Sequence, residues 1–372
     1  MKIMFCGGGT AGHLTPAIAI AEALLKQDKN TDVLFVCRED GSENEAVIKK
    51  GYQIKTISIS GIERKISFKN AKNILTALKA IKKSQKIIKE FSPDVVIGTG
   101  GYVTFPVLRA AQKMKIPTVI HESNACPGLV TKLLAPKCSR VLLNLKGSEK
   151  EFKNKKNIRI VGNPVREDFF INDKATARKK LGISHNEFLI SSFGGSGGSE
   201  KINNTIIALM NTHSSKSKKI RHIHSCGIKY YDKIKKEYPS LTSGKNGCVI
   251  KPYIYDISNV ILASDIIISR CGAMTLAEIC AAGCVAILIP SPNVTNNHQY
   301  KNAKLISDAE AAIMIEESEL NDRVLLDTVR KLEGDSELRG ILSKKIKDMY
   351  VKNSKELIVN EILSIVYNSA SK

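Results

Sequence analysis

Three glycine-rich segments constrain this chain more than any other feature, because each follows a short apolar stretch and precedes residues with helical character. They read Gly-Gly-Gly-Thr-Ala-Gly-His at 7–13, Gly-Thr-Gly-Gly-Tyr at 98–102 and Gly-Gly-Ser-Gly-Gly-Ser at 194–199. Glycine lets the backbone approach a ligand closely, and the first turn of a helix presents unpaired N–H groups that attract anions. One such loop is weak evidence for a nucleotide site. Three of them, divided between the two halves of the chain, predict a cleft that binds more than one phosphorylated compound.

Apolar stretches alternate with helical patterns along most of the chain. In the N-terminal half we expect strands at residues 2–6, 33–37, 56–60, 95–97, 118–120 and 141–145. After a turn-rich stretch at 161–166 the pattern restarts, with strands expected at 188–193, 222–225, 249–250, 266–269, 285–289 and 312–315. Continuous apolar strands between helices indicate parallel sheets that are covered on both faces. The predicted fold class is α/β, with two Rossmann-like doubly wound domains facing a ligand cleft.

The length of 372 residues also favours two domains, because a single core rarely grows beyond about 250–300 residues. We place the boundary after residue 163. The first helix is expected to begin at Pro16, with Thr15 as its cap, and to run to about residue 26. Further helices are expected at about 201–212, 275–282, 298–307 and 321–333, and the last stretch, from 335 to about 369, is expected to be helical with no strand.

The net charge of +21 is partly concentrated in one segment. Every charged residue between positions 64 and 89 is basic, and apolar residues recur there at helical spacing at Ile74, Leu78, Ile81 and Ile88. The segment is therefore predicted to form a basic amphipathic helix. Either it is the solvated face of an ordinary helix, or it contacts an anionic membrane surface.

The cysteines are scattered and form no Cys-x-x-Cys motif, which favours a reduced, cytosolic protein over a disulfide framework or a zinc site. We expect no signal peptide, because a core strand begins directly at Lys2. No apolar run reaches the about 20 residues that a spanning helix needs. The chain has no Asp-x-Asp motif, so we expect neither a metal ion bridging a diphosphate nor another cofactor.

A further candidate site follows the strand at 266–269, where the chain reads Arg-Cys-Gly-Ala-Met-Thr-Leu-Ala-Glu at 270–278. Backbone N–H groups at such a helix start suit a pyrophosphate, and Glu278 could accept hydrogen bonds from two ribose hydroxyls. Thr275 and Glu278 also have the spacing of a capping box, in which Glu278 would only cap its own helix. The residues alone leave both interpretations open.

Seven motifs occur in an order that is typical of one enzyme family. They are Gly-Gly-Thr-Ala-Gly-His at 8–13, Gly-Thr-Gly-Gly-Tyr-Val at 98–103, His-Glu-Ser-Asn at 121–124, Gly-Asn-Pro-Val-Arg at 162–166, Gly-Gly-Ser at 194–196, Gly-Ala-Met-Thr-Leu-Ala-Glu at 272–278 and His-Gln at 298–299. Over nearly its whole length the chain resembles the MurG family. These glycosyltransferases add N-acetylglucosamine to undecaprenyl-pyrophosphoryl muramoyl-pentapeptide (lipid I) in bacterial peptidoglycan synthesis.

The resemblance implies a GT-B fold and an inverting transfer from UDP-N-acetylglucosamine (UDP-GlcNAc) to the acceptor's 4-hydroxyl, giving lipid II. An acceptor and membrane-binding domain would span residues 1–163, with the helix at about 352–369 as a candidate to pack back on it. A donor domain would span 164–351. The enzyme would act at the cytoplasmic face of the bacterial cell membrane as a peripheral protein. Its partners would be UDP-GlcNAc, lipid I, the anionic membrane surface and cell-wall synthesis proteins, in a pathway that serves cell shape and cell division.

The resemblance also assigns residues, motif by motif. His13 is the first candidate for the base that takes the acceptor's hydroxyl proton, and Glu122 is its rival. On chemistry alone, His13 could instead be a structural hydrogen-bonder, and Glu122 could orient the loop at 121–128. The implied donor-binding residues are Thr10, Ala11, Gly12, Asn124, Arg166, Ser196, Ile254, Ala273, Met274, Thr275, Leu276, Ala277, Glu278 and Gln299. The implied acceptor-binding residues are Gly100, Gly101 and Tyr102.

Some positions depart from the family's pattern. Ala11 and Phe105 stand where glycine is usual, and Gly197 and Ser123 stand where glutamine is usual. These departures leave the acceptor side less closely specified than the donor side.

Three alternatives remain at this point. A related GT-B enzyme could use another acceptor. A nicotinamide or flavin oxidoreductase could use Gly7, Gly9 and Gly12 as its Gly-x-Gly-x-x-Gly motif. A nucleic-acid-binding module agrees with the basic pI but not with the sparse aromatic residues, so we expect no nucleic-acid partner.

Overall fold

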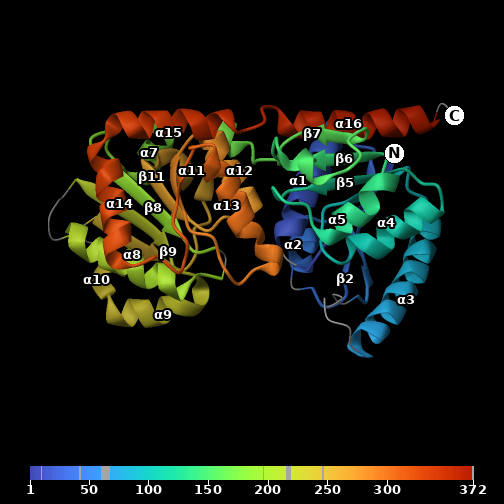
Figure 1. Ribbon diagram of the computed structural model, residues 1–372, viewed down its shortest axis with the longest axis horizontal. Coiled ribbons are helices and arrows are strands. Elements are labelled where there is room, and N and C mark those ends of the chain that lie inside the picture. Colours follow the sequence, from blue (N-terminus) through green and yellow to red (C-terminus); the bar gives the residue numbers. More distant parts are fainter. Residues whose placement is uncertain are drawn as a thin grey trace. The chain divides into compact units, whose positions relative to one another are not determined.

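The computed structural model describes residues 1–9, 11–41, 43–59, 68–195, 197–214, 219–244 and 247–370. The chain forms two compact units (Figure 1). The first consists of Met1–Pro164 together with Val351–Lys372, and the second of Val165–Tyr350. Each unit is an α/β structure around a parallel sheet, and the two are considered separately below.

The first unit contains a seven-stranded parallel sheet with the order β3-β2-β1-β4-β5-β6-β7. Its strands are β1 (Lys2–Cys6), β2 (Asp32–Arg38), β3 (Gln53–Ile57), β4 (Val95–Gly98), β5 (Thr118–Glu122), β6 (Arg140–Leu143) and β7 (Ile158–Ile160). Every residue of β4 and β5 is buried, as expected for central strands with helices on both faces.

The helices of this unit lie on both faces of its sheet. They are α1 (Ala11–Gln27), α2 (Asn44–Lys49), α3 (Phe68–Phe91), α4 (Thr104–Lys113), α5 (Leu129–Leu134), η1 (Ala135–Lys137), η2 (Ser148–Glu151) and α16 (Ser354–Ala370). Residues of α3 and α4 pack with Met4 on one face, whereas residues of α1 and α16 pack with Ile3 and Phe5 on the other.

Helix α16 belongs to the first unit although it ends the chain. Its apolar residues Ile358 and Ile362 are fully buried in the same core cluster as Leu24 of α1. At its start the Ser354 hydroxyl donates to the Asn163 carbonyl oxygen at 2.8 Å. The first unit is therefore assembled from both ends of the sequence.

The second unit contains a six-stranded parallel sheet with the order β10-β9-β8-β11-β12-β13. Its strands are β8 (Phe188–Phe193), β9 (Ile220–Ser225), β10 (Cys248–Lys251), β11 (Ile266–Ser269), β12 (Val285–Leu288) and β13 (Ile313–Met314). Its helices are α6 (Asp168–Ile171), α7 (Lys174–Leu181), α8 (Glu200–Ser214), α9 (Ile228–Glu237), α10 (Pro239–Thr242), α11 (Ile257–Ala263), α12 (Ala273–Ala282), η4 (Thr295–Asn297), α13 (His298–Asp308), α14 (Asp322–Gly334) and α15 (Ser336–Asp348). Residues of α8 and α14 fill one core cluster, and residues of α12, α13 and α15 fill another. The predicted fold class is confirmed.

Three expectations about single elements were wrong. Helix α1 begins at Ala11, directly after the glycine-rich segment, so Pro16 lies inside it and Thr15 does not cap it. Strand β3 spans Gln53–Ile57 and not 56–60; it is an edge strand, in which the exposed Gln53 and Lys55 alternate with the half-buried Ile54 and Thr56. Strand β7 was not expected at all. The last stretch is helical, as expected, and consists of the two helices α15 and α16, between which Asn353 has a positive φ of 56°.

The basic segment at 64–89 is described from Phe68 onward, where α3 begins; Arg64 and Lys65 lie outside the described residues. Among the helices of the described ranges, none combines the length and the apolar character needed to cross a membrane.

Candidate functional site

The first two glycine-rich loops meet in the first unit, because they follow the adjacent strands β1 and β4. Gly101 has a φ of 79°, and a Cβ atom there would lie 1.9 Å from the Gly8 carbonyl oxygen. Real Cβ atoms do not approach so closely, so this contact requires glycine. The two loops thus pack backbone against backbone.

His13 lies in the first turn of α1, half-buried against these loops. Its Nδ1 atom is 3.1 Å from the Gly8 carbonyl oxygen, and its ring lies where a Cβ atom on Gly100 would approach Cδ2 to 2.6 Å. A carbonyl oxygen only accepts hydrogen bonds, so in the neutral ring Nδ1 carries the proton. The lone pair of the imidazole is then on Nε2, which is the tautomer that a base acting through Nε2 needs.

Glu122, at the end of β5, is buried and accepts four hydrogen bonds. Oε1 accepts from the backbone and side-chain nitrogens of Asn124, both at 3.2 Å. Oε2 accepts from Gly128 N at 3.1 Å and from Thr131 Oγ1 at 2.7 Å. This arrangement ties the loop after β5 to the start of α5, as expected if Glu122 orients that loop.

The neighbouring His121 is fully buried, with Nε2 at 3.1 Å from the Gly162 carbonyl oxygen. Burial lowers the pKa of His121, while the hydrogen bond to Gly162 and the nearby Glu122 carboxylate oppose this shift.

The other predicted residues of the first unit lie at the loop ends. Gly12 is exposed in the first turn of α1, Asn124 is half-buried, and Tyr102 is exposed directly after Gly101. Ala11 begins α1, and Thr10 lies outside the described residues.

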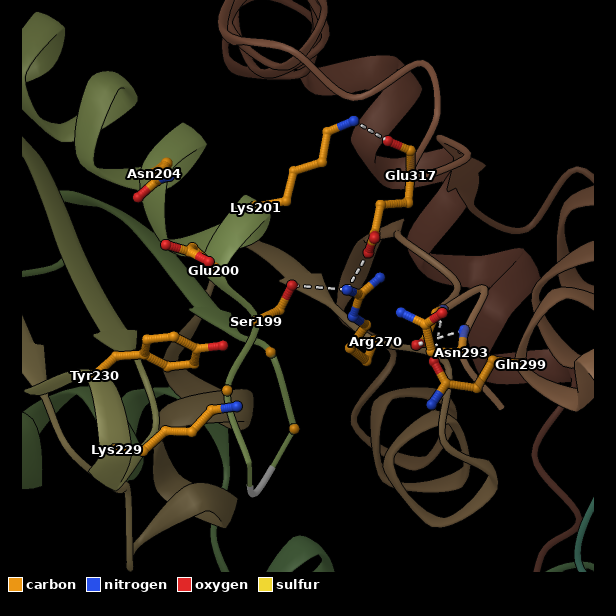
Figure 2. A pocket seen from close by; sticks show the side chains of 14 residues that line it. Ser199, Glu200, Lys201, Asn204, Lys229, Tyr230, Arg270, Asn293, Gln299 and Glu317 are labelled. Atoms are coloured by element: carbon orange, nitrogen blue, oxygen red, sulfur yellow. Dashed lines mark hydrogen bonds and ion pairs between the residues drawn. The ribbon is translucent and has the colours of Figure 1, made fainter. Parts of the chain in front are cut away.

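In the second unit, the third glycine-rich segment borders a cavity of about 700 Å³ (Figure 2). The segments that follow four parallel strands line it, as is usual for ligand sites in such sheets. Gly194 follows β8, Arg270 follows β11, Ser291 follows β12 and Glu317 follows β13. Gly195, Gly198, Ser199, Glu200, Lys201, Asn204, Lys229, Tyr230, Asn293 and Gln299 complete the lining. Ser196 lies outside the described residues.

Arg270 connects the segments around this cavity. One terminal nitrogen, Nη1, donates to the carbonyl oxygens of Ile289 at 3.3 Å and Pro290 at 3.1 Å. The other, Nη2, donates to Ser199 Oγ at 2.7 Å and to the Glu317 carboxylate (Figure 2). Because Arg270 is buried, these bonds hold the exits of β8, β12 and β13 together.

Gln299, in the first turn of α13, borders the same cavity. Its Oε1 atom accepts from Cys271 N at 3.2 Å and from Ser291 N at 2.9 Å. With Oε1 engaged in this way, the side chain offers its Nε2 hydrogens as donors to a ligand.

Glu278 pairs with Arg166. The Arg166 Nε and Nη2 atoms donate to Glu278 Oε1 at 2.9 and 2.7 Å. Helix α12 is capped at Gly272 without a side-chain hydrogen bond, so the capping-box interpretation of Thr275 and Glu278 was wrong. Burial raises the pKa of the Glu278 carboxyl, and the Arg166 guanidinium partly offsets this rise.

The remaining residues that were predicted to bind the donor differ in how far their side chains are exposed. Ala273, Met274 and Thr275 are half-buried at the start of α12, whereas the Leu276 and Ala277 side chains lie in the core. Ile254 is also buried, but the flanking Tyr253 and Tyr255 are exposed and pack edge to face, with their ring centroids 5.0 Å apart.

Two family models match the chain. The glycosyltransferase family 28 N-terminal domain matches residues 3–143, and the glycosyltransferase family 28 C-terminal domain matches residues 189–359. Relatives named UDP-N-acetylglucosamine--N-acetylmuramyl-(pentapeptide) pyrophosphoryl-undecaprenol N-acetylglucosamine transferase match over most of their length. The protein of Acetivibrio thermocellus is 38% identical over 371 residues, covering 100% of both chains. That of Caldanaerobacter subterraneus subsp. tengcongensis is 42% identical, covering 94% of this chain and 95% of the relative.

The chain belongs to this glycosyltransferase family. The resemblance to the MurG family that the motifs indicated is thereby confirmed. A crystal structure of Acinetobacter baumannii MurG has the same fold, with a TM-score of 0.78 at 24% identity, covering 98% of this chain and 99% of that one. The structure of UDP-GlcNAc 2-epimerase from Neisseria meningitidis bound to UDP-GlcNAc shares the fold, with a TM-score of 0.67 at 14% identity, covering 98% and 100%. The GT-B fold is confirmed.

Within each unit, the structure brings together part of what the family motifs assign. His13 contacts Gly100 in the first unit, and Arg166 contacts Glu278 in the second. Sequence reasoning did not select Arg270 or Glu317. Arg270 directly follows a strand expected to be buried, which was the available signal, but nothing in the sequence indicated its partner.

Proposed function

We propose that this enzyme transfers N-acetylglucosamine from UDP-GlcNAc to the 4-hydroxyl of the muramoyl sugar of undecaprenyl-pyrophosphoryl-MurNAc-pentapeptide. The observation that carries this proposal is the match to relatives named for this reaction, at 38% identity over the full length of both chains in one case. The product would be a β-linked disaccharide on the lipid carrier, formed with inversion at the anomeric carbon.

The second unit would bind the donor. Arg166, Ser196, Ile254, the residues from Ala273 to Glu278 and Gln299 would hold UDP-GlcNAc. The Arg166 guanidinium and the N–H groups at the start of α12 would stabilise negative charge on the leaving UDP. Gln299 supports this role because it lies at the cavity and offers its Nε2 hydrogens to a sugar hydroxyl.

The first unit would bind the acceptor and supply the base. His13 is the proposed base, since its hydrogen bond to Gly8 favours the tautomer that carries its lone pair on Nε2. Glu122 would orient the loop after β5, because four hydrogen-bond donors already surround its carboxylate. Gly100, Gly101 and Tyr102 would contact the acceptor's diphosphate, and Gly12 and Asn124 the donor.

Because the acceptor's lipid chain stays in the bilayer, the enzyme would act at the anionic cytoplasmic face of the cell membrane. Helix α3 supports membrane contact because Leu75 and Leu78 are 55% and 52% exposed on it. Exposed lysines accompany them at Lys79, Lys82, Lys83, Lys86 and Lys89. An amphipathic helix of this kind binds membranes through both its apolar area and its charge.

Two measurements test the proposal. Calorimetric titration with UDP-GlcNAc, UDP-glucose and NADH in parallel should show selective binding of UDP-GlcNAc. Incubation with UDP-GlcNAc and a lipid I analogue should then yield the disaccharide product, detected by mass spectrometry, with full turnover in excess chelator. Equal binding of the two sugar nucleotides, or no product from this acceptor, would contradict the proposed donor or acceptor respectively. Turnover that Mg²⁺ alone restores after chelation would overturn the metal-independent mechanism.

A further inference from the structure

We propose that Glu43 is a positioning residue for His13 and acts through a single peptide group of the first glycine-rich loop. The Gly9 N–H donates to Glu43 Oε1 at 2.5 Å. The carbonyl oxygen of the same peptide, that of Gly8, lies 3.1 Å from His13 Nδ1. A carboxylate, a peptide and an imidazole therefore form one chain of hydrogen bonds. The inference rests on the proposed function, in which His13 is the base.

The turn after β2 is built to present Glu43 to this loop. It is closed by hydrogen bonds to the Arg38 carbonyl oxygen, from Asn44 Nδ2 at 2.7 Å and from Gly41 N at 3.3 Å. Strand β2 pairs with β1, so the turn and the glycine-rich loop leave the sheet side by side. A Cβ atom on Gly8 would lie 3.3 Å from Glu43 Oε1, and one on Gly41 would lie 2.9 Å from it. The carboxylate thus fits closely between two glycines.

The chain of hydrogen bonds has a chemical consequence for His13. A carboxylate at the N–H end of a peptide polarises it and makes its carbonyl oxygen a stronger acceptor. A stronger acceptor at Gly8 holds the proton on Nδ1 and keeps the lone pair on Nε2. It also stabilises the imidazolium that forms when Nε2 takes the acceptor's hydroxyl proton, as a carboxylate bonded directly to a catalytic histidine does.

Other titratable or charged groups lie on the elements packed around the loop. Cys6 and Cys37 are buried, and burial raises the pKa of both thiols, that of Cys37 to about 12, so they stay neutral in the working pH range. Arg38, Glu39, Asp40 and Tyr102 are exposed. Glu43 is distinguished from them by its direct bond to the loop's backbone.

Three variants test the proposal in the full-length enzyme. Glu43→Ala removes both the hydrogen bond and the charge, Glu43→Gln keeps an acceptor without the charge, and Asp40→Asn removes an exposed charge from the same turn. We expect Glu43→Ala to lower kcat about 10- to 100-fold, since small displacements of catalytic groups have effects of this size. Glu43→Gln should recover most of kcat but shift the acidic limb of the kcat/KM profile to lower pH by a few tenths of a unit. Asp40→Asn should match the wild type in kcat and in the pH profile, and the UDP affinity of all three should be unchanged.

Amide hydrogen exchange of the segment at 1–9 gives a readout that does not depend on activity. Exchange should be faster in Glu43→Ala than in Asp40→Asn. A Glu43→Ala variant with the kcat and exchange of Asp40→Asn would overturn the inference, and so would a loss of kcat that only follows a lower folded fraction. If the wild type itself makes no product from lipid I, the proposed function fails instead, and the positioning role falls with it.

Discussion

Arg166 donates two hydrogen bonds to one carboxylate oxygen of Glu278, across 112 positions of sequence. The Glu278 side chain is 10% exposed and the Arg166 side chain 46%. A buried carboxylate is therefore neutralised by a guanidinium that solvent and ligands can still reach. A diphosphate could share the guanidinium without leaving the carboxylate unpaired.

Replacing Arg166 by alanine should destabilise the second unit in a pH-dependent way. Burial raises the folded-state pKa of Glu278, so the folded state holds this proton more tightly than the unfolded chain does, and stability falls as pH rises from the ordinary value near 4.5 through the folded pKa. Without Arg166 the folded pKa rises further, so the loss should be small at pH 4.5 and reach about 1–2 kcal/mol at pH 7.5. Urea unfolding at both pH values measures it. In the Arg166→Ala background, adding Glu278→Gln should restore most of the loss; an equal loss at both pH values would argue against this account.

Acid should weaken the second unit through its buried histidines. Burial lowers the pKa of His222 to about 3 and that of His224 to about 4. The contribution of these two neutral rings to the free energy of unfolding is complete above the ordinary histidine pKa of 6.5. It is lost as the pH falls from 6.5 toward the folded-state pKa values. Between pH 7.5 and 5.5 the loss should be about 2–3 kcal/mol, seen in urea unfolding. His224→Gln should flatten this dependence and replacement of the exposed His185 by glutamine should not; equal slopes in the two variants would contradict the assignment.

Replacing His13 should separate catalysis from binding. We expect His13→Ala to lower kcat about 10²- to 10⁴-fold while leaving the calorimetric affinity for UDP within a few-fold of the wild type. His13→Asn is the matched control, because its amide can still donate to the Gly8 carbonyl oxygen but cannot act as a base. If His13→Asn keeps most of the activity, His13 is a structural residue and not the base.

Neutralising α3 should release the protein from anionic vesicles. Changing Lys79, Lys82, Lys83 and Lys86 to glutamine should lower partitioning about 10²- to 10³-fold, at about 1 kcal/mol per lysine. Cosedimentation with vesicles that contain phosphatidylglycerol measures this, and about 0.5 M salt should weaken wild-type binding in the same direction. A control variant changes three exposed lysines of α9, Lys233, Lys235 and Lys236, and is compared with a variant in which only Lys79, Lys82 and Lys83 of α3 are changed. Binding that falls equally in the control set would show a general charge effect without a docking helix.

The sequence predicted the interior strands well and the edges poorly. Strands such as β4 and β12 are continuous apolar runs, which are typical of buried parallel strands. In the edge strand β3, polar and apolar residues are mixed, so it has no apolar run to reveal it. Strand β7 has only three residues and lies just before the turn-rich stretch at 161–166. Helix α1 was placed too late because Pro16 is a good first residue of a helix, yet the glycine-rich loop had already started one.

For the candidate site, the sequence predicted which loops carry the functional residues, but not which side chains those residues contact. Family motifs pointed to Glu278, but only the folded chain shows that Arg166 and not the helix end occupies its carboxylate. Glu43 lies in an acidic turn that contains no recognisable motif, so the local sequence does not single it out. Its contact with Gly9 depends on β2 pairing with β1, which a local pattern does not reveal.

The position of α16 has a consequence for biosynthesis. The core of the first unit includes Ile358 and Ile362, so a nascent chain that has completed β7 still lacks part of that core. Residues 165–350 must be translated before α16 emerges from the ribosome. At about 5–20 residues per second this delay is roughly 10–40 s. During that time the second unit, which is one continuous stretch, can fold to completion while the unit that began first waits for its last helix.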